Sequence, residues 1–112
     1  MKVSAFGLTF DSGIERDRYL VLLSRLQAGE LSDLQAHPTL TLAPAFVDPA
    51  GHKWQPATYT PDFTYTEDGV RVYEEVKPAA KHAPSVTRRD WSVRQAWAAR
   101  VNPEAIFRTV KL

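Results

Sequence analysis

The stretch TYTPDFTYTEDGVRVYEEVK, residues 58 to 77, decides the fold of this chain. Two runs rich in aromatic and β-branched residues flank the dipeptide Asp68-Gly69. This dipeptide favours a two-residue hairpin turn, because both of its positions accept the positive φ that the turn requires. The stretch therefore predicts a β-hairpin in which Glu67 faces Val70.

The predicted hairpin has two chemically different faces, because side chains alternate along each strand. Further from the turn, the same register sets Asp62 opposite Glu75 and Thr60 opposite Lys77. The face that points away from these charges should meet the core. Besides Glu74 it carries Tyr59, Pro61, Phe63, Tyr65, Val70, Val72 and Val76. We therefore expect Glu74 to pair with a basic residue rather than to bind a metal.

The opposed carboxylates of Asp62 and Glu75 need an explanation. Like charges that face each other destabilise a sheet unless one is protonated or a cation lies between them. Mg²⁺ binds carboxylate oxygens, often only one or two of them together with water and a substrate phosphate. The pair is thus a candidate metal site with Lys77 beside it. The alternative is a solvated polar face on which Lys77 neutralises the acids, and the residues alone leave both open.

Outside the hairpin, the chain predicts an α+β or α/β domain with a small mixed sheet flanked by helices. Ser12 and Glu15 have the spacing of a capping box, which predicts a helix from about Gly13 to Ala28. A second helix is expected over residues 87–101. Strands are expected over residues 37–42, 54–66, 70–77 and 105–110, and prolines interrupt the second of them. Between these elements we expect a short connection around Leu31 and Leu34, a turn at 48–51 and a loop at 78–84.

Length and composition fit a single domain over residues 1–112, with 44% hydrophobic and 24% charged residues. The chain has no cysteine, which excludes disulfides and thiolate metal sites. Its three histidines lack the spacing of a zinc site. No run approaches the roughly 18 apolar residues of a membrane span, so we expect a cytoplasmic protein without a membrane partner.

Positive charge is concentrated in the C-terminal part of the chain. Residues 1–70 hold 5 Lys/Arg and 9 Asp/Glu, net −4, whereas residues 71–112 hold 9 and 4, net +5. A basic segment indicates a polyanionic partner such as DNA. The residues predicted to contact phosphates are Lys81, Arg88, Arg89 and Arg94. The alternative is a solvated helix face.

Pro61-Asp62 followed by Glu75-Val76-Lys77 resembles the PD-(D/E)xK signature of the restriction-endonuclease-like nuclease superfamily. The run from residue 10 to 110 is also similar to small phage and prophage nuclease-like or resolvase-like proteins of this superfamily. They share the pattern FxSxxExxRYxxL, xPxF, PDF and E-x-VK, then a closing helix and strand. Pro78 is a departure, because these relatives often have glycine at that place.

The resemblance implies a metal-dependent DNA endonuclease on a single restriction-endonuclease-like domain. Asp62 and Glu75 would bind Mg²⁺ or Mn²⁺ with the carbonyl of Val76, and Lys77 would orient water and stabilise the transition state. Glu15 would complete the metal shell directly or through water. The alternative is that Glu15 only caps its own helix. The expected substrate is branched or junction DNA, and the expected location is the host cytoplasm if a phage or mobile element encodes the protein.

Two other functions stay open at this point. One is a non-catalytic nucleic-acid-binding or assembly module that keeps the nuclease fold, and the other is a nuclease subunit of a larger complex. A homodimer is also expected, because a domain this small with three tryptophans leaves apolar surface to cover. Two active sites related by a two-fold axis would also suit the cutting of two strands.

Overall fold

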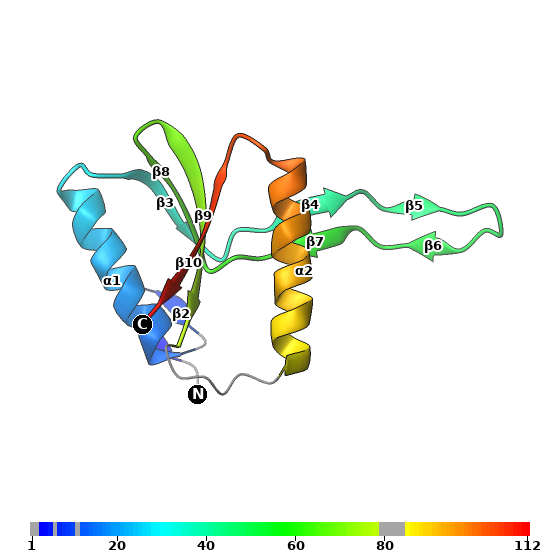
Figure 1. The fold of residues 1–112 in the computed structure, drawn as a ribbon. Helices are drawn as coiled ribbons and strands as arrows, with labels where there is room; N and C mark the ends of the chain where they lie inside the picture. Colours follow the sequence, from blue (N-terminus) through cyan, green and yellow to red (C-terminus); the bar gives the residue numbers. More distant parts are fainter. Residues whose placement is uncertain (1–2, 6, 11, 79–84) are drawn as a thin grey trace.

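The computed structural model describes residues 3–5, 7–10, 12–78 and 85–112 (Figure 1). Side chains are described for residues 7–10, 12–78 and 92–112. In chain order the elements are β1 (Val3–Ala5), β2 (Leu8–Phe10), α1 (Gly13–Gln27), β3 (Ser32–Ala36), β4 (Leu40–Ala43), β5 (Phe46–Val47), β6 (Lys53–Trp54), β7 (Ala57–Tyr59), β8 (Phe63–Glu67), β9 (Val70–Lys77), α2 (Ser85–Val101) and β10 (Ile106–Lys111).

The predicted α+β class and mixed sheet are confirmed. Four strands form a sheet in the order β10-β9-β8-β3, in which β10 runs parallel to β9 and the other neighbours are antiparallel. Helix α1 packs against β3, β9 and the β1-β2 hairpin, whereas α2 contacts β4, β7 and β10. Figure 1 shows the two helices on opposite sides of the sheet strands. Neither described helix is long and apolar enough to cross a membrane.

The predicted hairpin register is confirmed from Glu67 opposite Val70 to Phe63 opposite Glu74. Both turn residues, Asp68 and Gly69, have positive φ, at 53° and 76°. The side chains of the predicted core face are buried except for Val70, which is half-buried, and most of them belong to two clusters. Phe63, Tyr65, Val72 and Val76 pack with residues of α1, β2 and β3, and Tyr59 packs with Leu42 and Ala98.

The pairing of Thr60 with Lys77 is wrong, because the antiparallel ladder stops at Phe63. Strand β7 pairs with β4 instead, and Thr60 lies in neither strand. Pro61 has no N–H to donate to a ladder. The backbone N–H of Asp62 donates to the Glu74 carbonyl at 3.0 Å. The next hydrogen bond to β9 is made by the Asp62 side chain, which accepts from the Val76 N–H.

Two further elements differ from expectation. Residues 32–36 form strand β3 rather than a connection, and Leu31 before them is part of the buried core. The β1-β2 hairpin was not predicted. Strand β3 has the sequence SDLQA, which carries little strand propensity, so its pairing with β8 depends on tertiary contacts.

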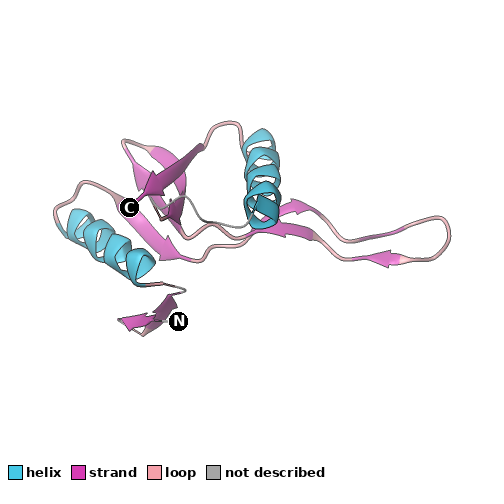
Figure 2. Ribbon diagram, turned by 60° about the horizontal axis from the view of Figure 1, so that its bottom comes forward, coloured by secondary structure: helices cyan, strands magenta, loops and turns pink. Residues whose placement is uncertain are grey.

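Strands β4 to β7 form a two-stranded arm, in which β4 pairs with β7 and β5 pairs with β6. Figures 1 and 2 both show the arm extending from the body of the molecule beyond α2. The predicted turn over residues 48–51 forms its tip and is confirmed. Asp48 closes this turn, since its Oδ1 accepts hydrogen bonds from the backbone N–H groups of Ala50 and His52.

Candidate active site

The end of β9 and the first turn of α1 border an open cleft with a volume of about 640 Å³. The sequence places the predicted catalytic residues on three separate segments, and all of them line this one cleft. Its lining consists of Ser12, Gly13, Ile14, Glu15, Asp17, Asp62, Glu75, Val76, Lys77 and Pro78. The fold therefore gathers the four charged residues that were predicted to act together.

The carboxyl groups of Asp62 and Glu75 are adjacent, close enough for a hydrogen bond when one of them carries a proton. Asp62 Oδ2 accepts a 2.7 Å hydrogen bond from the backbone N–H of Val76, and Glu75 Oε1 accepts one of 2.8 Å from the hydroxyl of Tyr59. Glu75 is only 5% exposed. Each carboxylate thus accepts a hydrogen bond from a neutral donor, which fixes its orientation in the cleft.

Burial raises the pKa of Asp62. Several neighbours lower this pKa but do not outweigh burial. They are the Val76 N–H, the contact with Glu75, and the charges of Lys77 and His37. The desolvated pair thus favours either a shared proton or an added cation, since both reduce the negative charge that the cleft must hold.

Lys77 lies beside this carboxylate pair and lines the same cleft. Its Nζ lies 3.8 Å from Glu75 Oε2, and about a third of its side chain is exposed to solvent. The backbone around it is fixed, because the Lys77 carbonyl accepts a 3.0 Å hydrogen bond from the N–H of Leu112 after β10. The ammonium group is therefore close to the acids and also accessible from the cleft.

Glu15 lies in the first turn of α1, and its backbone and its carboxylate make different contacts. Its backbone N–H donates to Oγ of the N-cap Ser12 at 3.3 Å, so the predicted start of α1 is confirmed. The residue is 4% exposed, and Oε1 of its carboxylate lies 2.5 Å from Nε2 of His37. The carboxylate thus belongs to the wall of the cleft.

His37 and Tyr59 were missed by the sequence analysis. His37 has a φ of 53°, and its N–H donates to the Asp62 carbonyl at 2.8 Å. This backbone conformation brings its ring to Glu15, which lies 22 residues earlier. No local pattern encodes this contact or the one from Tyr59 to Glu75, since both arise where separate segments converge.

The donor set of the cleft fits a hard divalent cation held by Asp62 and Glu75. Among the described residues, no group of three or more His, Asp and Glu side chains is arranged to hold a metal ion. The fit is therefore to a site with two carboxylates, where water and substrate phosphate supply the other ligands, as Mg²⁺ commonly requires. Direct ligation by Glu15 or by the Val76 carbonyl stays a prediction.

The predicted phosphate-binding residues are only partly described. Lys81 lies outside the described residues, and Arg88 and Arg89 lie in α2 but have side chains outside them. Arg94 is exposed, and its guanidinium donates a 2.8 Å hydrogen bond to the carbonyl of Thr58 in β7. Contact of these residues with DNA stays a prediction.

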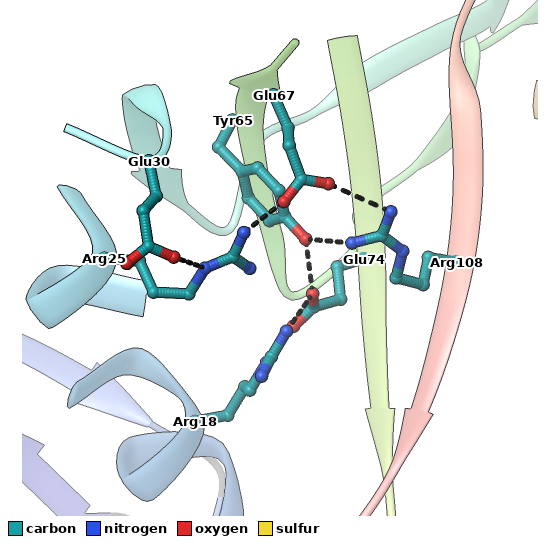
Figure 3. A network of polar contacts seen from close by, with 7 residues as sticks. All are labelled: Arg18, Arg25, Glu30, Tyr65, Glu67, Glu74 and Arg108. Atoms are coloured by element: carbon teal, nitrogen blue, oxygen red, sulfur yellow. Dashed lines mark hydrogen bonds and ion pairs between the residues drawn. The ribbon is translucent and has the colours of Figure 1, made fainter. Parts of the chain in front are cut away.

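Glu74 lies on the opposite face of β9 from Glu75, as predicted, and is fully buried. Arg18 binds it with two hydrogen bonds of 2.8 and 2.9 Å, and the hydroxyl of Tyr65 donates to it at 2.7 Å (Figure 3). Arg108 links Tyr65 to Glu67 and so extends the network to the turn end of the hairpin. Burial and the neighbouring carboxylate raise the pKa of Tyr65 to about 12, so its hydroxyl stays a donor.

The model of one protein family matches the whole chain, residues 1–112, and its description reads "protein of unknown function (DUF1064)". The chain belongs to the DUF1064 family. Comparisons with curated proteins and with solved structures find no match. In this DUF1064 protein, the cleft and the residues that line it are the features that bear on function.

Proposed function

We propose that this DUF1064 protein is a Mg²⁺-dependent DNA endonuclease with a PD-(D/E)xK-type active site on a restriction-endonuclease-like fold. One observation carries the proposal: Asp62, Glu75 and Lys77 converge in the same cleft as Glu15. The acids are adjacent and the lysine lies beside them, which is the combination that metal-assisted phosphodiester hydrolysis needs.

The residues of the cleft have separate roles in this proposal. Asp62 and Glu75 hold the cation, which when bound polarises the scissile phosphate and makes a coordinated water more acidic. The Val76 N–H and the Tyr59 hydroxyl fix the orientation of these two carboxylates. Lys77 orients the attacking water and stabilises the negative charge that develops on the phosphate.

The substrate we propose is branched or junction DNA, and a phage or mobile element is the proposed origin. The described residues form two helices, one four-stranded sheet and three two-stranded sheets, and we assign none of these elements to the reading of a long base sequence. Recognition of DNA shape needs fewer base contacts, since phosphate contacts can position a protein without reading sequence.

The direct test is incubation of the purified protein with supercoiled, linear, single-stranded and four-way-junction DNA. Each form is tested with Mg²⁺, with Mn²⁺ and with EDTA. We expect cleavage only with a metal ion, and the fastest cleavage for the junction. Equal cleavage in EDTA would exclude the metal mechanism. Binding without cleavage of any form would favour a non-catalytic nucleic-acid-binding module.

Replacing Lys77 by alanine should abolish most cleavage and leave DNA affinity largely intact. A group that acts on the transition state changes the rate, whereas one phosphate-directed charge among several contributes a modest share of binding. Single-turnover rates and equilibrium binding to the same DNA measure the two effects separately.

The matched control is Lys111→Ala, which removes a lysine paired in register with Lys77 on the neighbouring strand β10. Lys111 does not line the cleft. The control variant should therefore cleave at close to the wild-type rate. If Lys77→Ala lowers affinity and rate by the same factor, Lys77 acts in binding only.

A further inference from the structure

The arm carries an aromatic face that the rest of the described chain does not cover. Phe46 and Trp54 face each other across the β5-β6 pair with stacked rings, and 59% and 50% of these residues are exposed. The ring of His52 packs edge-on against Trp54 at 4.5 Å, and Asp48 accepts a hydrogen bond from Trp54 Nε1. The face is thus preformed, because its side chains hold one another in place.

The charge of the arm distinguishes between two kinds of partner. Residues 40–59 contain one lysine and one aspartate, so the arm has no net charge with His neutral. Elements that bind DNA need positive charge to replace counterions on the phosphates. Exposed aromatic residues with few charges are instead typical of the centre of a protein–protein interface.

The same chain offers a complementary apolar surface on α2. Val93, Trp97 and Val101 recur every four residues along this helix and are 61%, 39% and 46% exposed. Buried Ala98 on the same helix packs against the base of the arm, with Leu42 and Tyr59. Helix α2 is therefore fixed next to the root of the arm, while β5 and β6, which carry Phe46 and Trp54, lie further out along it (Figure 1).

We propose that a second copy of this chain covers the arm, as a two-fold dimer. The aromatic face of each arm, Phe46 and Trp54, packs on the partner's α2 stripe. In a two-fold dimer the contact is made twice, so one arm and one stripe per protomer suffice to complete it.

The exposed area is sufficient for such a contact. The exposed parts of the two arm residues and the three stripe residues provide on the order of 500 Å² per protomer. Two protomers together would bury on the order of 1,000 Å², which is the lower limit for a specific interface.

Light scattering on the full chain, without DNA or metal, tests this dimer. We expect the wild type to be a dimer and the double variant Phe46→Ser/Trp54→Ser to be a monomer with a similar melting temperature, because both residues lie outside the buried core. The matched control is Val47→Ser, which changes a 60% exposed residue that pairs with Lys53 on the other face of the arm. This control should stay dimeric.

Cross-linking identifies the contact itself, because the chain has no cysteine. Phe46→Cys and Val93→Cys proteins are mixed and oxidised, and the linked peptides are identified by mass spectrometry. We expect a disulfide between residue 46 of one protomer and residue 93 of the other.

A monomeric wild type, or a dimer that persists in the arm double variant, would overturn the proposal. If the wild type is a monomer and the arm variant loses DNA affinity, the arm contacts nucleic acid instead. Since no assay of the dimer involves cleavage, its outcome is independent of the proposed nuclease function.

Discussion

Replacing Glu75 by glutamine is expected to lower the rate of metal-dependent DNA cleavage by about a hundredfold or more. The substitution keeps the shape of the side chain and the acceptor for the Tyr59 hydroxyl, but it removes the charge that would hold the cation. The melting temperature should stay unchanged or rise, because Glu75 and Asp62 form a desolvated pair of like charges. Initial rates at saturating Mg²⁺ and thermal unfolding measure both effects.

The adjacent residue supplies the control for this experiment. Glu74→Gln is the same chemical change one position away, on the opposite face of β9 and outside the cleft. It should leave the proposed metal requirement of DNA cleavage unchanged. If Glu74 proves essential for cleavage and Glu75 dispensable, the assignment of the metal site to the Glu75 face is wrong.

Glu74→Gln should instead have a large effect on stability. The variant leaves the Arg18 guanidinium, whose side chain is 15% exposed, without the carboxylate that binds it at two points. Breaking a buried ion pair by removing one partner costs about 3–5 kcal/mol of unfolding free energy. For a domain of this size, the melting temperature should fall by about 10 °C or more. Calorimetry and circular dichroism measure it.

The comparison for this variant is Glu67→Gln, at the more exposed end of the same network. Glu67 contacts Arg25 and Arg108, and its side chain is 18% exposed. Because solvent screens this position more than Glu74, the loss of unfolding free energy should be clearly smaller. Equal melting temperatures for Glu74→Gln and wild type would show that the Arg18–Glu74 pair does not stabilise the fold.

The helices and the central hairpin could be predicted because their signals are local. Asp68-Gly69 fixes the turn, and alternation of apolar and polar residues fixes which face of β8 and β9 is buried. The N-cap Ser12 likewise marks the start of α1 within its own first turn. The opposite orientations of Glu74 and Glu75 follow from this alternation alone.

The prediction of strand pairing failed where the partner is distant or the ladder is interrupted. The outward extension of the hairpin to Thr60 and Lys77 assumed a regular ladder, but Pro61 and the side chain of Asp62 end it. Strand β3 and the long arm were not recognised, because pairing with a remote strand and burial of Leu31 offset weak local propensity.

By itself, the sequence determined the α+β class, the hairpin register and the shared face of the two predicted metal ligands. Turn chemistry and side-chain alternation act over a few residues, so both can be recognised from the sequence without knowledge of the tertiary structure. Only the tertiary structure decided that His37 meets Glu15, that Tyr59 holds Glu75, and that an aromatic arm extends beyond α2. These contacts join segments that are distant in the sequence. Their geometry is fixed only when the helices and the sheet have packed together.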